Sequence, residues 1–155
     1  MKILVVSDSH GSVGPILTAI DREKPDVIIH LGDGINDLKD LNFQGQIYAV
    51  RGNNDMNGKL KTMAKVSHGK TIILYMHGHE QDLNQGYGKL VDFSTQQGAN
   101  IVLFGHTHKP DYFERNGIKF VNPGAMKERS TATYATITFT TEDDFNIEHK
   151  KVLEA

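Results

Sequence analysis

Short apolar runs, separated by polar and glycine-containing stretches, make up most of the first two thirds of the chain. The first run, Lys2–Val6, is rich in β-branched residues and is typical of a buried strand. The next segment, Ser12–Glu23, has apolar residues at helical spacing, and Pro25 ends that pattern. We predict further strands at Asp26–Leu31, Gln46–Val50, Lys59–Ser67, Thr71–Met76 and Ile101–Phe104. A short helix or turn is predicted at Ile35–Leu41, and a helix at Tyr87–Gln97.

The last third of the chain is rich in predicted strands. The dipeptide Asn116-Gly117 is a strong hairpin signal, and it joins Asp111–Arg115 to Ile118–Val121. Thr133–Thr140 and Phe145–Val152 are predicted as a final antiparallel pair. Alternating strands and helices followed by strands alone indicate an α/β fold, built either on one mixed sheet or on two sheets packed together. No linker or internal repeat interrupts the pattern, so we expect one domain over all 155 residues.

The composition of the chain excludes several kinds of site and partner, although it says little about the fold. Without cysteine, the chain can form neither thiolate metal sites nor disulfides. A net charge of −2 argues against a broad surface for nucleic-acid phosphates. The opening apolar run is too short for a secretion signal or a membrane span. We therefore expect a cytoplasmic protein with no membrane partner and no strong nucleic-acid patch, and we leave open whether it forms a homo-oligomer.

Ligand-type side chains follow five of the predicted strands, each at the point where the strand ends. In open α/β sheets, ligands bind beyond the carboxyl ends of the strands, so these segments are expected to converge on one place. A glycine lies in or beside each segment, and we expect these glycines to let crowded loops approach closely. The segments are Ser7–Gly11, Gly32–Gly34, Arg51–Asp55, His77–His79 and Gly105–His108.

The mixture of histidine, aspartate and asparagine in these segments favours a metal site. Imidazole suits borderline transition metals and carboxylate or amide oxygen suits harder ions, so the mixture argues against calcium. There are more candidate ligands than one four-coordinate zinc requires, and two metals about 3.5–4 Å apart serve in-line displacement at phosphorus. In an extended backbone, the imidazoles of His106 and His108 would point the same way.

Taken in order, the motifs D-x-H, G-D, G-N-x-D, H-G-H and G-H-x-H resemble those of the calcineurin-like metallophosphoesterases, and the short length resembles their small prokaryotic phosphodiesterase branch. The resemblance implies an α/β/β/α sandwich of two mixed sheets, in which a metal-bridging hydroxide attacks a phosphate ester in line. It also implies two divalent metal ions that share Asp33. One ion would be held by Asp8, His10, Asp33 and His108, and the other by Asp33, Asn53, His77 and His106.

The third motif departs from the family pattern. Many relatives carry a histidine after the asparagine of this motif, where it acts as a general acid or transition-state stabiliser, and here that position is Asn54. An amide can donate a hydrogen bond to a phosphoryl oxygen but cannot deliver a proton at pH 7. His79 is a candidate substitute acid. We therefore expect the best substrates to be diesters with acidic leaving groups.

Other functions stay open from the sequence. A eukaryotic trafficking-coat subunit resembles this family and acts as a scaffold, so a non-catalytic protein-interaction scaffold is the alternative to hydrolysis, and a mononuclear structural site is a third hypothesis. Mn is the expected activating metal, with Fe, Ni, Co or Zn as alternatives. The expected substrate is a small phosphodiester or nucleotide-like ester. Aromatic residues that could stack a base, and that the sequence does not place, are Tyr48, Tyr75, Tyr87, Tyr112 and Phe113.

Several polar residues also have simpler interpretations. Taken alone, Asp8 could cap a helix, and Asp33 and Asn53 could be turn residues. Asp55 is expected to support a ligand or a turn, and the Lys150-Lys151 pair is expected to be solvated. The histidines that we expect to be structural are His30, His68 and His149.

Overall fold

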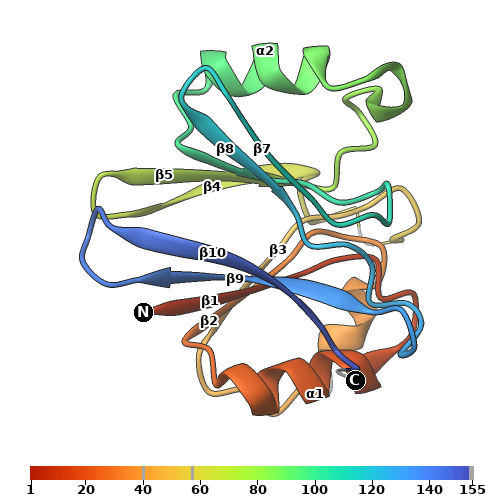
Figure 1. The fold of residues 1–155 in the computed structure, drawn as a ribbon. Helices are drawn as coiled ribbons and strands as arrows, with labels where there is room; N and C mark the ends of the chain where they lie inside the picture. Colours follow the sequence, from red (N-terminus) through yellow and green to blue (C-terminus); the bar gives the residue numbers. More distant parts are fainter. Residues whose placement is uncertain (40, 57, 154–155) are drawn as a thin grey trace.

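Two five-stranded β-sheets pack face to face, with a helix on the outer side of each (Figure 1). The computed structural model describes residues 1–39, 41–56 and 58–153. In spatial order, the first sheet consists of β10 (Phe145–Lys151), β9 (Thr133–Phe139), β1 (Lys2–Val6), β2 (Val27–His30) and β3 (Gln46–Ala49). The second consists of β4 (Met63–His68), β5 (Thr71–Met76), β6 (Ile101–Leu103), β8 (Ile118–Asn122) and β7 (Asp111–Arg115).

Both sheets are mixed, with parallel strands at their centres. In the first sheet, β1, β2 and β3 are parallel and β9 is antiparallel to both β1 and β10. In the second sheet, β5, β6 and β8 are parallel, and the edge strands β4 and β7 are antiparallel to their neighbours. The predicted α/β/β/α sandwich is confirmed, and of the two arrangements that the strand pattern left open, the chain forms two packed sheets.

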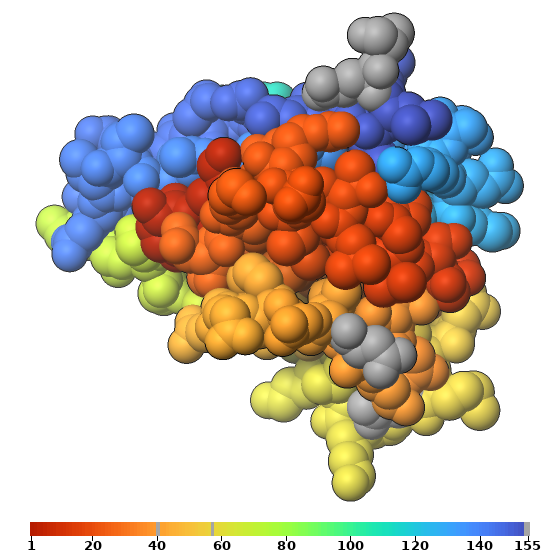
Figure 2. All heavy atoms as spheres, turned by 90° about the horizontal axis from the view of Figure 1, so that it is seen from below, coloured from red at the N-terminus to blue at the C-terminus, as the bar shows by residue number. Residues whose placement is uncertain are grey.

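The side-chain alternation of each central strand divides the core into layers. Ile29 and Val5 lie in the cluster between the two sheets, whereas Leu4 packs with Ile16 on the outer side of the first sheet. Leu90 belongs to a third cluster on the outer side of the second sheet. Figure 2 views the molecule from the side that the first helix covers. The two covering helices are α1 (Val13–Glu23) and α2 (Gly88–Gln96).

The structure differs from the predicted elements mainly at their ends. β4 begins at Met63 rather than at Lys59, because the preceding residues turn and the Lys61 carbonyl accepts a hydrogen bond from the Arg51 N–H. The segment after the second predicted strand is the 3₁₀ helix η1 (Ile35–Leu38), and a further 3₁₀ turn, η2 (Leu83–Gln85), was not predicted. Within the described residues, no helix has the length and apolar character needed to cross a membrane.

A buried ion cluster joins the end of α1 to the two terminal strands. The Glu23 side chain is only 2% exposed, and it accepts hydrogen bonds from Tyr134 Oη at 2.6 Å and from Lys150 Nζ at 3.0 Å. Lys2 Nζ lies 3.2 Å from Glu23 Oε1. Burial alone would raise the pKa of Glu23, but these partners outweigh it and lower the pKa. The expectation that Lys150 is simply solvated is wrong, because a buried carboxylate requires a paired cation.

Candidate metal centre

The segments that follow β1, β2, β3, β5 and β6 meet at one end of the sandwich, on the right in Figure 1. Backbone hydrogen bonds tie the first two segments together: the Asp8 N–H donates to the Gly32 carbonyl at 2.9 Å, and the His10 N–H donates to the Asp33 carbonyl at 3.0 Å. The His106 N–H donates to Asp8 Oδ2 at 3.1 Å, which links the two sheets. The strand ends therefore converge as their positions in the sequence predicted.

One group of candidate ligands comprises Asp8, His10 and His108, whose ligand atoms lie within 4.8 Å of one another. Asp8 Oδ1 is 3.2 Å from His108 Nε2 and 3.7 Å from His10 Nε2. The other oxygen of Asp8 accepts a hydrogen bond from Ser7 Oγ at 2.6 Å, which turns Oδ1 toward the two histidines. Asp8 is no helix cap, since α1 begins only at Val13.

A second group comprises Asp33, His77 and His106, again with ligand atoms within 4.8 Å of one another. His77 Nδ1 lies 2.7 Å from the Leu31 carbonyl oxygen, which can only accept, so Nδ1 carries the hydrogen and the Nε2 lone pair faces the site. This Nε2 is 3.2 Å from His106 Nδ1 and 3.1 Å from Asn53 Oδ1. Asn53 therefore lies against the second group.

Asp33 lies within reach of both groups. Its Oδ2 is 3.3 Å from His77 Nε2 and 3.9 Å from His10 Nε2. The residue is only 2% exposed, so its carboxylate stays in place between the two sets of imidazoles. This position matches the shared ligand that the family resemblance implied.

The donor set fits metal ions, because several of its atoms lack partners. Asp8 Oδ1 and His10 Nε2 are buried and have no hydrogen-bond partner among the described residues, although nearly all buried polar atoms are paired in proteins. In the second group, three ligand-type atoms crowd together: His77 Nε2 lies 3.1 Å from Asn53 Oδ1 and 3.2 Å from His106 Nδ1. A cation in each group would satisfy all of these atoms.

Histidine protonation in the second group also suits a metal. Burial, followed by the neighbouring His77, lowers the pKa of His106 below its ordinary value. A metal binds the neutral imidazole, so a lowered pKa keeps the ligand in its binding form at neutral pH.

Five of the candidate ligands adopt a left-handed backbone conformation that residues other than glycine rarely take. A positive φ costs such a residue roughly 1–2 kcal/mol, and it persists at functional sites where the surrounding structure enforces it. The φ angles are 51° at Asp8, 45° at His10, 57° at Asp33, 69° at His106 and 66° at His108.

The His106-Thr107-His108 segment serves both groups, in line with the ligand sets that the family resemblance implied. His106 and His108 do not lie in extended backbone, and their imidazoles belong to different groups, one with Asp33 and the other with Asp8. With a positive φ angle at each histidine of the His-x-His segment, one short loop supplies a ligand to each group.

Gly52 illustrates the close approach that the glycines were predicted to allow. A Cβ added at this position would collide with the carboxylate and backbone nitrogen of Asp33. The Gly52 N–H also donates to Asp55 Oδ2 at 2.8 Å. A glycine is therefore required here for the third segment to pack against the carboxylate between the groups.

The Asp55 carboxylate holds two of the segments together and belongs to neither ligand group, as predicted. Burial alone would raise its pKa, but hydrogen bonds from four backbone N–H groups outweigh burial and lower the pKa. These N–H groups belong to Asp33 at 2.7 Å, Gly52 at 2.8 Å, Gly34 at 2.9 Å and Ile35 at 3.3 Å.

A hydrogen-bond chain beneath the site was not predicted. His30 Nδ1 accepts a hydrogen bond from the Gly32 N–H at 3.0 Å, so the ring hydrogen is on Nε2, 3.0 Å from Ser9 Oγ. Ser9 Oγ donates in turn to Asp37 Oδ2 at 2.5 Å. Burial lowers the pKa of His30 to about 4. The sequence signal for this chain was a histidine within an apolar strand, which is consistent with the structural role expected for His30.

The two residues predicted to act on the substrate have different surroundings. Asn54 contacts Asp33: its N–H donates to Oδ1 at 2.8 Å and its side-chain amide donates to Oδ2 at 2.9 Å. The His79 ring lies 5.4 Å from the His77 ring, and its Nδ1 is buried without a partner among the described residues. Burial, followed by His77, lowers the pKa of His79, which works against proton donation at neutral pH.

A cavity of about 610 Å³ adjoins the second ligand group, because His106 forms part of its wall. The segment leading into α2 contributes Leu83 and Tyr87, and the loop between β6 and β7 contributes Lys109 and Pro110. Its volume lies in the range of small-molecule sites, roughly 300–1,000 Å³.

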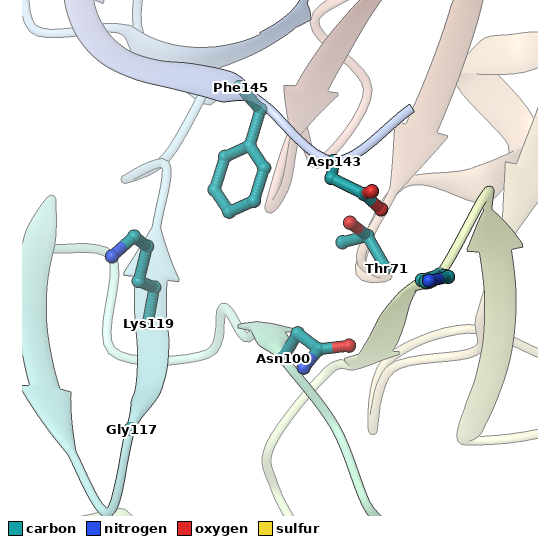
Figure 3. A pocket seen from close by; sticks show the side chains of 7 residues that line it. Thr71, Asn100, Gly117, Lys119, Asp143 and Phe145 are labelled. Atoms are coloured by element: carbon teal, nitrogen blue, oxygen red, sulfur yellow. The ribbon is translucent and has the colours of Figure 1, made fainter. Parts of the chain in front are cut away.

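A different hollow, of about 300 Å³, lies away from the candidate ligands (Figure 3). Thr71 and Asn100 lie in its wall at the starts of β5 and β6, together with Gly117 in the β7–β8 turn. These are the ends of the strands opposite to His77 and His106, so this hollow does not open onto the candidate metal centre.

The sequence matches known proteins over nearly its whole length. Residues 1–144 match the calcineurin-like phosphoesterase superfamily domain. The chain is 34% identical to a probable metallophosphoesterase of Mycoplasma pneumoniae, over 88% of each protein. It is 29% identical to a phosphodiesterase of Methanocaldococcus jannaschii, over 80% of this chain and 83% of that protein. It is also 34% identical to vacuolar protein sorting-associated protein 29 of Schizosaccharomyces pombe, over 95% of this chain and 80% of that protein.

Solved structures share the fold. A predicted phosphoesterase from Streptococcus pneumoniae superposes with a TM-score of 0.82 at 30% identity, covering 97% of this chain and 89% of that one. Vps29 from Entamoeba histolytica, in complex with Zn²⁺, has a TM-score of 0.75 at 18% identity, covering 99% and 100% of the two chains, which shows the fold alone. With two sheets, two ligand groups and a family match over residues 1–144, the chain belongs to the calcineurin-like phosphoesterase superfamily.

Proposed function

We propose that this chain is a phosphodiesterase that binds two divalent cations and hydrolyses a small phosphodiester. The observation that carries the proposal is the position of Asp33, whose Oδ2 lies within 4 Å of both His10 Nε2 and His77 Nε2, at 3.9 Å and 3.3 Å. A single structural metal would need only one of the two ligand groups. The phosphodiesterase of Methanocaldococcus jannaschii supports the choice of diesters over other phosphate esters.

Two cations would be held by the groups described above, with Asn53 completing the second and Asp33 common to both. We propose Mn as the activating metal, because the mixed oxygen and nitrogen donors suit a borderline ion. When bound, two such ions neutralise phosphoryl charge and supply a hydroxide nucleophile near neutral pH.

The protein's own residues have two further tasks. Asn54 uses its backbone N–H and one side-chain hydrogen to hold Asp33, and its second side-chain hydrogen is available for a phosphoryl oxygen. An amide cannot release a proton at pH 7, so Asn54 cannot protonate the alcohol oxygen of the leaving group. In hydrolysis, water's oxygen forms a bond to phosphorus, the bond to the leaving oxygen breaks, and a diester yields a monoester and an alcohol. Diesters with acidic alcohols should therefore react best.

A metal-reconstituted activity screen tests this proposal. The metal-free chain would be loaded with Mn, Fe, Ni, Co or Zn and assayed on bis(4-nitrophenyl) phosphate, 4-nitrophenyl phosphate and alkyl monoesters. We expect hydrolysis to be fastest on the diester and to be lost in Asp33→Ala and His77→Ala, whereas His68→Gln, which lies outside both groups, retains it. Elemental analysis should give two metals per chain.

A wild type without activity under every metal would favour the alternative, a non-catalytic scaffold. That alternative is motivated by the relative from Schizosaccharomyces pombe, whose name associates it with protein sorting. One bound metal per chain, with no loss of that metal in Asp33→Ala, would instead favour a mononuclear structural site. Equal rates on alkyl monoesters and on the diaryl diester would contradict the predicted preference for acidic leaving groups.

A further inference from the structure

The cavity of about 610 Å³ beside His106 has two kinds of wall. Leu83, Tyr87 and Pro110 provide apolar surface, and the polar surface comes from Asn84, Thr107, Lys109 and Asp111. Lys109 is the cation nearest in sequence to the candidate ligand His108. Among the described residues, no carboxylate forms an ion pair with Lys109. A hollow that combines an apolar surface with an unpaired cation, at the edge of the candidate metal centre, suits an organic group attached to a phosphate.

The Tyr87 ring is held rigidly as part of this wall. Its ring stacks on Phe113 at a centroid distance of 4.7 Å and an interplanar angle of 19°, and its hydroxyl donates to Asp111 Oδ2 at 2.8 Å. Because the hydroxyl is already paired, the tyrosine offers the cavity an apolar ring rather than a hydrogen-bond donor. A fixed aromatic ring in a wall is a surface on which a heterocycle can stack.

Tyr87 is also the aromatic candidate that the structure places at the metal centre. Tyr112 lies in the wall of a separate hollow near His149, and Tyr48 lies in the wall of one of about 160 Å³ that strands of both sheets line. Tyr75 is buried in the core between the sheets. Among the described residues that line the cavity at His106, Tyr87 is the aromatic side chain, apart from the imidazole itself.

We propose that this cavity binds the nucleoside-like part of the substrate, with its base stacked on Tyr87 and its phosphate charge near Lys109. This inference rests on the proposed function, because the phosphate must reach the two ligand groups while the attached group enters the cavity. The substrate class is therefore a nucleotide-like phosphodiester rather than a simple alkyl diester.

Product binding tests this assignment without requiring turnover. The affinities of the zinc-loaded chain for AMP and for ribose 5-phosphate would be measured by calorimetry, since the two differ only in the base. Because stacking of a base on an aromatic residue is worth about tenfold or more, we expect AMP to bind at least tenfold more tightly. Tyr87→Leu should bring the ratio close to one, whereas Tyr87→Phe, which keeps the ring, should retain it.

Lys109 has its own matched control. Lys109→Gln should weaken AMP and ribose 5-phosphate alike, by about twofold to fivefold as for an exposed charge pair. Lys89→Gln, at an exposed lysine that pairs with Asp82 and does not line this cavity, should change neither affinity. Unequal effects of Lys109→Gln on the two ligands would contradict its assignment to the phosphate.

A nuclear magnetic resonance titration of the zinc-loaded wild type keeps the test decisive if Tyr87→Leu does not fold. AMP, but not ribose 5-phosphate, should shift the amide resonances of Leu83, Asn84 and Tyr87. Equal affinities for the two ligands in the wild type, or AMP shifts confined to other surfaces, would overturn the assignment. Metal-dependent diester hydrolysis, together with equal affinities for AMP and ribose 5-phosphate, would reject this subsite and leave the proposed function intact. Tight AMP binding without hydrolysis of any diester would reject the proposed function and leave the assignment of the cavity intact.

Discussion

Asn54 donates two hydrogen bonds to the carboxylate of Asp33, one from its backbone N–H to Oδ1 at 2.8 Å and one from its side chain to Oδ2 at 2.9 Å. Asn54, at the position where the family resemblance implies a histidine, therefore orients the carboxylate between the two ligand groups. Groups that orient a metal ligand typically contribute a factor of 10–100 to metal affinity or activity.

Replacing Asn54 separates its two tasks. Asn54→Ala keeps the backbone donor and removes the side-chain donor, so we expect metal affinity or diester activity to fall by about tenfold. Asn54→His restores a proton donor, and we expect the rate on alkyl monoesters relative to the nitrophenyl diester to rise by about tenfold or more. Metal titrations and steady-state rates on both substrates measure these effects. An unchanged substrate ratio in Asn54→His would show that leaving-group protonation does not limit the reaction.

A methyl group at Gly52 should disturb the candidate metal centre directly. Gly52→Ala places a Cβ against the Asp33 carboxylate, so we expect metal content per chain and activity to fall at least tenfold while the circular dichroism spectrum stays native. Gly58→Ala is the matched control, because an added Cβ there meets nothing within 4 Å. Equal metal content in the two variants would show that the Asp33 carboxylate can move aside without loss.

Acid should destabilise the protein partly through His30. The folded pKa of this histidine is about 4 and the unfolded value is about 6.5, so between these pH values the unfolded chain binds more protons and stability falls as pH falls. The total effect is about 3 kcal/mol of unfolding free energy. His30→Gln removes this titration. We expect the stability difference between wild type and His30→Gln, measured by urea unfolding in the presence of a chelator, to shrink from pH 7 to pH 4. A difference that is constant over this range would contradict the assignment.

The ion cluster at the end of α1 should matter for stability but not for activity. Glu23→Ala removes the carboxylate that Tyr134, Lys150 and Lys2 share, and we expect it to lower the free energy of unfolding by about 2–4 kcal/mol. The cluster lies at the start of β1, far along the strand from Asp8, so kcat/KM of the folded protein should not change. Urea unfolding and an assay at low temperature measure the two quantities. Reduced kcat/KM at full folding would place Glu23 in contact with the site.

The sequence determined the order of strands and helices because their signal is local. Burial of one or both faces leaves alternating or continuous apolar runs, and these predicted β1, β2, β5 and β6 within about two residues. The residue types that follow each predicted strand can be read from the sequence without knowing the conformation of the loop. The candidate ligands could therefore also be named from the sequence. The start of β4 was less well predicted, because the turn before it depends on a hydrogen bond to a distant segment, the one between Arg51 and Lys61.

What only the tertiary structure decided is how these residues meet. The hydrogen bond from His106 to Asp8 joins positions 98 residues apart, and no local pattern encodes it. The left-handed conformations of His106 and His108 are maintained by such contacts, since each is unfavourable in isolation. The same holds for the contact of Asn54 with Asp33 and for the position of Tyr87 beside His106. The sequence thus determined the chemical character of the candidate centre through local burial and residue type, and long-range packing determined its geometry.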